Sequence, residues 1–338
     1  MSWIKNLLLI LVVIIFSSLL LEFGSRLIFL ISPGPKLMDS SQGIQLKIPF
    51  NEPNSEYRQV FAEYNVPTKI DSLGNRVTPA SASGANTTIL FLGDSFTFGQ
   101  GVADIDTIPN YFCTAVNAQC VNLGVPGTGL VKQFEKLSDY LSKNNLSTNV
   151  LLYHLILAST EARHSGNDIT DTLRELNEKN ESVQAKYSNT EQVSKKDSAG
   201  ALIRFARWLS VNSNAFRVLR TVFGNQLRHI AWSNAENAFT NDELAMFSRE
   251  LNRITDKLKK NKIIYKPVLL STFSEVDLNK RELTERKLKS LTNVDLVKID
   301  YQKRNYSSFF FPLDGHANAK GNSFIATQIV EHFLQSSK

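Results

Sequence analysis

From residue 87 onward, continuous apolar runs alternate with segments of helical periodicity, and no other feature constrains the fold as much. The β-rich apolar runs are residues 88–92, 120–123, 150–157, 263–270 and 296–299. The helical segments are residues 108–116, 130–141, 242–258, 282–291 and 319–334. Strands that are apolar on both faces are typical of a parallel sheet covered by helices on both sides. The sequence therefore predicts an α/β domain over residues 87–338.

The amino-terminal part is much more apolar than the rest of the chain. Residues 7–21 read LLLILVVIIFSSLLL, and residues 23–31 continue the run past Glu22 and Arg26. Crossing a bilayer takes about 20 residues, and on a helix Glu22 and Arg26 would pair four residues apart. We therefore predict a signal anchor within residues 1–33 that holds the protein in the membrane as a transmembrane helix.

The charge before this run indicates the orientation. Lys5 and the amino group precede the apolar residues, which favours translocation of the body of the chain. A cleaved signal peptide is the alternative, but no small-x-small cleavage site follows the run. In both cases the body of the chain is expected outside the cytoplasm, in the periplasm or at the cell surface.

Composition narrows the range of partners. The formal net charge is +6 and the pI is about 9.1, which favours mild attraction to acidic glycans or lipid headgroups. No Lys/Arg block is long enough to argue for a nucleic-acid partner. No metal-ligand spacing occurs, and neither a metal nor a cofactor is expected.

Two further segments complete the organisation. Residues 34–86 are expected to be extended with short strands; in TKIDSLGNRV, a strand is followed by a turn at Leu73 and Gly74 and a second extended piece. Residues 160–240 are expected to be a helical insertion after the third strand. Its part from 174 to 198 is polar and expected to be mobile. Its part from 201 to 227 carries arginines among apolar residues, which fits basic amphipathic helices that either pack on the domain or act as a lid or surface contact.

Cys113 and Cys120 are the only cysteines. In an oxidising compartment they could close a short loop if a helix end and the following strand bring their Cα atoms within about 6 Å. Two free, buried thiols are the alternative.

Three polar stretches follow strands or precede the last helix. They are Gly93-Asp94-Ser95, the sequence NLGVPGTG from Asn122 to Gly129, and DGH from Asp314 to His316. In an open parallel sheet, ligands bind beyond the carboxyl ends of the strands. We therefore expect these stretches to converge there.

Their residue types fit nucleophilic catalysis. A serine hydroxyl needs a base, and histidine has a suitable pKa near neutrality. We predict Ser95 as the nucleophile, His316 as the base and then acid, and Asp314 as the group that orients His316. The backbone N–H groups of Ser95 and Gly124 are predicted donors to the oxyanion.

These residues resemble the SGNH/GDSL hydrolase family, in its membrane-anchored bacterial form that includes polysaccharide O-acetyl esterases and acetyltransferases. The Gly-Asp-Ser block, the Gly of the second block and the final Asp and His match Ser95, Gly124, Asp314 and His316. The resemblance implies a flavodoxin-like SGNH fold with a roughly five-stranded parallel sheet.

The chain departs from the family pattern twice. Asp314 and His316 are separated by one residue, where many members have two. The family also places an asparagine directly after the third strand as a third oxyanion donor, and this chain has Ser159 and Thr160 there. Asn167 follows about eight residues later and is the predicted third donor, with the hydroxyls of Ser159 and Thr160 as alternatives.

The resemblance implies a serine esterase or O-acyltransferase that acts through an acyl-enzyme, with O-acetyl groups of a cell-surface glycan as the expected substrate. Partners in envelope polysaccharide modification are expected with it. The alternative is a non-catalytic SGNH scaffold that binds glycan or an envelope partner, which the altered third block favours and the intact Ser, Asp and His disfavour.

Overall fold

The structure is a computed structural model, and it describes most of the chain after residue 51. The described residues are 6, 13, 16–24, 37–38, 52–61, 63–81, 87–144, 150–160, 167–187, 239–271, 278–292, 294–301, 306–311 and 314–336.

The centre of the fold is a five-stranded sheet in which every pair of neighbours is parallel. Its strands are β4 (Thr88–Gly93), β5 (Gln119–Gly124), β6 (Val150–Leu157), β7 (Ile264–Leu270) and β8 (Val297–Lys298). Their spatial order is β5-β4-β6-β7-β8. Numbered along the chain, this is the flavodoxin-like order 2-1-3-4-5. The predicted fold class is therefore confirmed.

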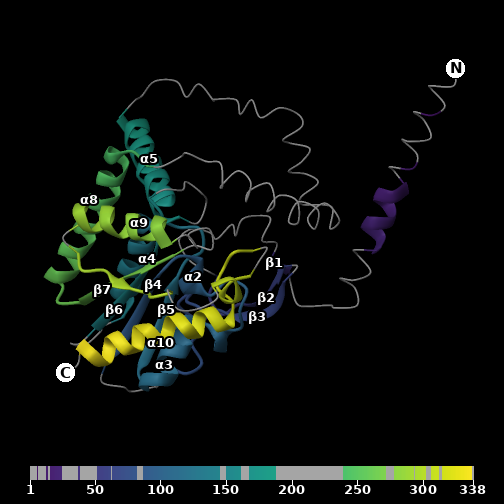
Figure 1. Cartoon of the computed structure of the whole chain (residues 1–338), viewed down its shortest axis with the longest axis horizontal. Coiled ribbons are helices and arrows are strands. Elements are labelled where there is room, and N and C mark those ends of the chain that lie inside the picture. Colours follow the sequence, from purple (N-terminus) through teal and green to yellow (C-terminus); the bar gives the residue numbers. More distant parts are fainter. Residues whose placement is uncertain are drawn as a thin grey trace.

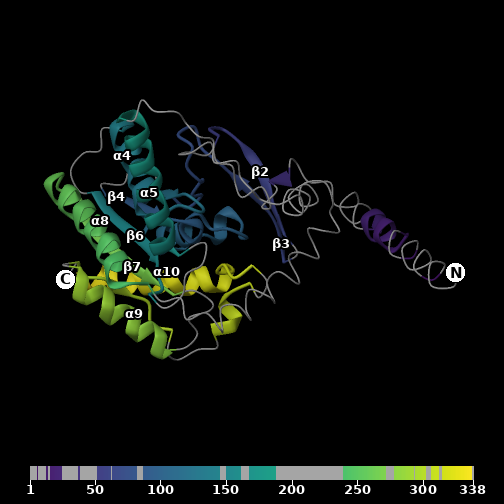
Figure 2. The ribbon, with the colours of Figure 1, turned by 90° about the horizontal axis from the view of Figure 1, so that it is seen from above.

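Helices cover both faces of this sheet (Figures 1 and 2). One face carries α3 (Ile108–Val116) and α10 (Ala319–Ser336). The other carries α4 (Leu130–Lys143), α5 (Asp168–Tyr187), α8 (Asn241–Lys260) and α9 (Leu278–Leu291). Alternate residues of β4 enter the two cores: Ile89 and Phe91 face α3 and α10, while Leu90 and Leu92 face the other layer.

A small second sheet precedes the domain and lies beside it. It consists of β1 (Leu37–Met38), β2 (Glu56–Phe61) and β3 (Tyr64–Lys69), and β2 and β3 form an antiparallel hairpin. The turn predicted at Leu73 and Gly74 is present after β3. It is held by Oδ1 of Asp71, which accepts the N–H groups of Leu73 and Asn75. Tyr57 and Ile70 of this segment pack against Phe98 of the main domain.

The predicted anchor lies largely outside the described residues, which include only 13 and 16–24 of the run from 7 to 31. Within the described part of the chain, no helix is both long and apolar enough to cross a membrane. The arginine-rich stretch from 201 to 227 also lies outside the described residues.

The described start of the predicted helical insertion is α5. Residues 174–187, the first part of the stretch expected to be polar and mobile, belong to this helix, whose first half packs against α4. The buried side chains of α5 are mostly polar, and they include Asp168, Asp171, Thr172 and Glu175. A polar buried face leaves no apolar periodicity for sequence analysis to detect.

Candidate active site

Ser95 begins a one-turn helix directly after the central strand β4. This helix is α2 (Ser95–Phe98), and Asp94 caps it because its Oδ1 accepts the N–H of Phe96 at 2.9 Å. Ser95 is only 5% exposed and Asp94 only 1%. The turn therefore holds the serine at the carboxyl edge of the sheet, as the sequence predicts.

Ser95, His316 and Asp314 form a hydrogen-bonded chain. Nε2 of His316 lies 2.7 Å from Oγ of Ser95, and Nδ1 of the same ring lies 2.7 Å from Oδ2 of Asp314. A carboxylate can only accept, so the bond to Asp314 places the proton of the neutral ring on Nδ1. Nε2 is then the acceptor for the serine hydroxyl. This is the arrangement in which a histidine can remove the proton of a serine nucleophile.

A tight turn brings Asp314 and His316 together. The N–H of Phe311 donates to the carbonyl of His316 at 2.9 Å, and the N–H of Gly315 donates to the carbonyl of Phe311 at 2.8 Å. Gly315 has φ +83°, a conformation that residues with a Cβ adopt at a cost. The single intervening residue therefore suffices because it is a glycine.

The electrostatics favour an imidazolium at this site. Burial alone would lower the pKa of His316, but the charge of Asp314, its hydrogen bond and the charge of Asp94 outweigh burial and raise that pKa above its ordinary value. Burial also raises the pKa of Asp94 to about 6, against the opposing effect of its bond to the N–H of Phe96. The charged form of Asp94 thus adds negative charge beside His316.

The two predicted oxyanion donors, the N–H groups of Ser95 and Gly124, differ in whether they already make a hydrogen bond. The N–H of Ser95 makes no hydrogen bond with any residue that the structure describes. The N–H of Gly124 donates to Oδ1 of Asn122 at 3.0 Å, so an oxyanion would have to displace this acceptor. A Cβ at Gly124 would collide with the backbone of Phe98, so close packing against α2 already requires a glycine there. The role of Gly124 as a donor stays a prediction.

The three candidates for the third donor lie near the end of β6. Asn167 caps α5, since its Oδ1 accepts the N–H of Ile169 and its Nδ2 donates to the carbonyl of Ser159 at 2.8 Å. Thr160 Oγ1 is 3.1 Å from Oγ1 of Thr284. The hydroxyl of Ser159 is buried and has no hydrogen-bond partner among the residues that the structure describes. The chain thus returns to the strand end at Asn167, but no hydrogen bond among the described residues joins these side chains to Ser95.

Sequence analysis missed two residues that hold the end of α2. Arg76 is 1% exposed; its Nη1 donates to the carbonyls of Phe98 and Gly99 and its Nη2 to that of Val102. Asn122 donates from Nδ2 to the carbonyl of Thr97 at 2.9 Å. In the sequence, Arg76 belongs to the DSLGNRV stretch and Asn122 precedes Leu123. Neither position indicates which backbone carbonyls the side chain binds.

The loop between β5 and α4, residues 125–129, is held at its far end by α5. Oε1 of Glu175 accepts the N–H of Gly129 at 2.7 Å, and its Oε2 accepts those of Val131 and Lys132 at 3.1 and 3.2 Å. Thr172 Oγ1 accepts the N–H of Leu130 at 2.9 Å. These bonds cap α4, whose own N-cap is a glycine without a side chain.

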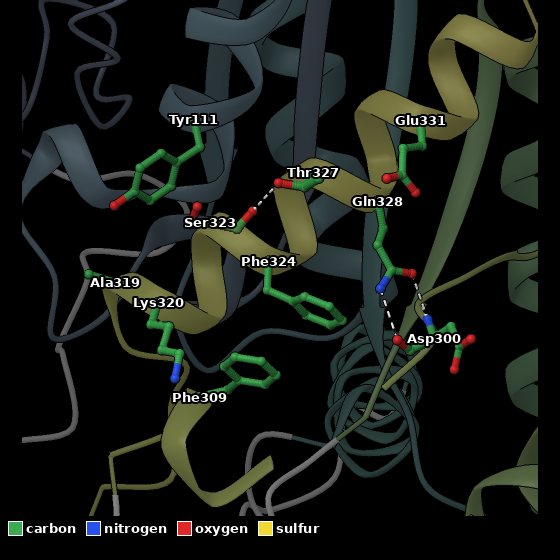
Figure 3. A pocket seen from close by; sticks show the side chains of 10 residues that line it. All are labelled: Tyr111, Asp300, Phe309, Ala319, Lys320, Ser323, Phe324, Thr327, Gln328 and Glu331. Atoms are coloured by element: carbon green, nitrogen blue, oxygen red, sulfur yellow. Dashed lines mark hydrogen bonds between the residues drawn. The ribbon is translucent and has the colours of Figure 1, made fainter. Parts of the chain in front are cut away.

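A pocket of about 830 Å³ lies along the outer face of α10 (Figure 3). Gln328 and Asp300 exchange hydrogen bonds of 2.7 and 2.9 Å at one end of it, and Tyr111 of α3 also lines it. None of the three triad residues lines this pocket. Within the described ranges, no group of three or more His, Cys, Asp or Glu side chains could hold a metal ion.

No model of a known protein family matches the chain, and neither does any curated protein. Solved structures that it resembles include a lipolytic protein of the G-D-S-L family from Veillonella parvula, with 12% identity, 74% of this chain and 99% of that chain covered, and a TM-score of 0.41. A psychrotrophic esterase from Pseudoalteromonas sp. matches with 12% identity over 74% of this chain and 98% of its own, at a TM-score of 0.39. A carbohydrate esterase matches with 10% identity, 85% and 84% coverage, and a TM-score of 0.40. Likeness of this size does not establish an activity, which has to be judged from the site itself.

Proposed function

We propose that the protein is a serine esterase or O-acyltransferase that works through an acyl-enzyme at Ser95. The observation that carries this proposal is the chain of two 2.7 Å hydrogen bonds from Ser95 through His316 to Asp314. It joins residues that lie 221 positions apart in sequence. The intact nucleophile, base and orienting group disfavour a non-catalytic scaffold, which needs no activated serine.

In the first half-reaction, Oγ of Ser95 attacks the carbonyl carbon of an ester while Nε2 of His316 takes the hydroxyl proton. Asp314 holds Nδ1–H and stabilises the positive ring. The tetrahedral intermediate collapses by breaking the bond to the leaving alcohol, and His316 returns the proton to that oxygen. The acyl group then remains on Ser95.

In the second half-reaction, the oxygen of an O–H group attacks the acyl carbon while Nε2 of His316 takes its proton. The bond between the acyl carbon and Oγ of Ser95 then breaks, and His316 returns the proton to Oγ. Water as the attacking group gives ester hydrolysis, and a sugar hydroxyl gives acyl transfer. We propose an O-acetyl group of a cell-surface glycan as the acyl donor. The net charge of +6 supports an acidic glycan.

The proposed location is outside the cytoplasm, with the amino-terminal helix as membrane anchor. Its support is the apolar run from 7 to 31 behind Lys5. Protease added to spheroplasts should digest the body of the protein. Complete protection until the cells are lysed would refute this location.

For the oxyanion we propose the N–H groups of Ser95 and Gly124 together with the amide of Asn167. Removing one such donor typically slows the reaction by about 10²–10³. Asn167→Ala should lower the acylation rate at least about tenfold, with Ser159→Ala and Thr160→Ala as matched controls that change it little. A silent Asn167→Ala beside a crippled Ser159 or Thr160 variant would move the role to that hydroxyl.

The activity is tested with p-nitrophenyl acetate and with an O-acetylated polysaccharide. Wild type should release p-nitrophenol and acetate, and Ser95→Ala should reduce both to the background rate. Folded wild-type protein that hydrolyses neither substrate and transfers no acetyl group to an added glycan would favour the scaffold function.

A further inference from the structure

The β2–β3 hairpin (residues 56–69) touches both halves of the candidate catalytic site. Ser95, Asp314 and His316 belong to two separate segments: Ser95 begins α2, and Asp314 and His316 lie on the turn before α10. Each segment needs its own support if the 2.7 Å contact between Ser95 and His316 is to persist.

The turn of the hairpin is in direct contact with the segment that carries Asp314 and His316. Oε2 of Glu63 accepts the backbone N–H of Asp314 at 2.8 Å. The next residue, Tyr64, packs against the same turn, with its ring centroid 5.1 Å from that of Phe311 and the two rings tilted by 53°. The turn that carries Asp314 is therefore held from outside by a segment about 250 residues earlier in the chain.

On the nucleophile side, the hairpin holds the loop that follows α2. Oε1 of the buried Gln59 accepts the N–H of Gly101 at 2.8 Å, while its Nε2 donates to Thr68 Oγ1 at 2.7 Å. A Cβ at Gly101 would lie 2.7 Å from the ring of Tyr64 and 2.8 Å from that of Phe311. The hairpin, the loop after α2 and the turn that carries Asp314 thus meet at Gly101.

We propose that Glu63 is a positioning residue of the catalytic site, which fixes Asp314 and through it the ring of His316. The inference rests on the proposed function for its catalytic consequence. The structural part of the inference does not depend on the proposed function, because it is the hydrogen bond from the N–H of Asp314 to the carboxylate of Glu63. Glu63 touches no reacting atom, so its loss should change turnover through geometry while leaving substrate affinity in place.

The test compares Glu63→Ala with Glu63→Gln in the full chain. Glutamine keeps an acceptor oxygen, whereas alanine leaves the N–H of Asp314 without one. Glu56→Ala is the matched control, because Glu56 lies on the same hairpin and its carboxylate pairs with Lys69 at 3.7 Å, both side chains being exposed. Thermal melts of all three variants establish that they fold.

With p-nitrophenyl acetate, Glu63→Ala should lower kcat by about tenfold with KM within about twofold. It should also move the acidic limb of the pH profile downward, since Asp314 would raise the pKa of His316 less. Glu63→Gln should restore most of kcat, and Glu56→Ala should match wild type. An unchanged kcat in Glu63→Ala, or a loss expressed in KM alone, would overturn the proposal.

Hydrogen exchange separates this inference from the proposed function. The peptide that contains Asp314 should exchange faster in Glu63→Ala than in wild type, Glu63→Gln or Glu56→Ala. Equal exchange in all four proteins would overturn the inference whether or not the protein is an esterase. If wild type shows no activity but Glu63→Ala alone exchanges faster, the proposed function fails and the positioning of Asp314 by Glu63 stands.

Discussion

Nδ1 of His316 lies 2.7 Å from Oδ2 of Asp314, although a single residue separates them in the chain. Two hydrogen bonds between Phe311, Gly315 and His316 close the turn that makes this contact. The short spacing therefore depends on the backbone conformation of Gly315 more than on the residues that flank it.

Gly315→Ala should weaken this contact. A Cβ at Gly315 meets no atom within 4 Å, so the strain comes from φ +83° and should cost about 1–2 kcal/mol. We expect kcat on p-nitrophenyl acetate to fall while the thermal melt changes only modestly. Gly315→Asn is the control, because asparagine tolerates this conformation better. Wild-type kcat in Gly315→Ala would show that the turn does not depend on its glycine.

The acidic limb of the pH profile of activity should depend on the charge of Asp94. His316 must be neutral to act as a base, and its pKa is raised in part by the charge of Asp94. Asp94→Asn keeps an oxygen to cap α2 but removes the charge, so the acidic limb of kcat/KM should move to lower pH. Asp139→Asn, on α4, is a control of equal charge change. A limb that stays in place for Asp94→Asn would exclude this coupling.

Glu175→Ala should destabilise the fold, because it removes the acceptor of three backbone N–H groups at the start of α4. We expect the free energy of unfolding in urea to fall by about 1–3 kcal/mol. Lys143→Ala, at the other end of α4, is the control for a change on a surface ion pair. A loss no larger than that of the control would argue against the cap.

The same residue should make stability depend on pH. Burial raises the pKa of Glu175 from 4.5 to about 7, so the folded state holds this proton more tightly than the unfolded state. Relative to Glu175→Gln, wild type should therefore lose stability as the pH rises from 4.5 through about 7. A difference that is constant over this range would contradict the raised pKa.

Cys113 and Cys120 are joined in a disulfide between α3 and β5, with Cα atoms 6.1 Å apart. If the body is translocated, denatured protein trapped without reductant should show no free thiol. Removing the bridge with Cys113→Ala and Cys120→Ala should lower the free energy of unfolding by about 2–3 kcal/mol. Quantitative alkylation of both thiols in freshly isolated protein would contradict an oxidising location.

Much of the sheet could be predicted because its strands are apolar on both faces. The structure places β6 at the predicted bounds, residues 150–157, and ends β4 one residue later than predicted, at Gly93. The bounds of α5 within the predicted helical insertion could not be predicted, because its buried contacts run through Asp168, Thr172 and Glu175, which look like surface residues in a sequence.

Ser95, Asp314 and His316 could be picked out from the sequence because their motifs are local. The residues that hold their segments in place, Arg76 and Glu63, could not. Ser95, Asp314 and His316 each sit in a short recognisable stretch beside a strand end or the last helix. Arg76 and Glu63 bind backbone groups of distant segments, and a backbone acceptor or donor has no sequence signature. Only the folded chain shows that they meet the site.

The central claim is that Ser95 is an activated nucleophile, and a fluorophosphonate probe measures this directly. The probe should modify folded wild-type protein on the peptide that contains Ser95, as identified by mass spectrometry. Ser95→Ala should abolish this labelling, and His316→Ala should slow it strongly because the serine would lose its base. Folded wild-type protein that is not labelled, or that is labelled at another serine with Ser95 left unmodified, would contradict the account.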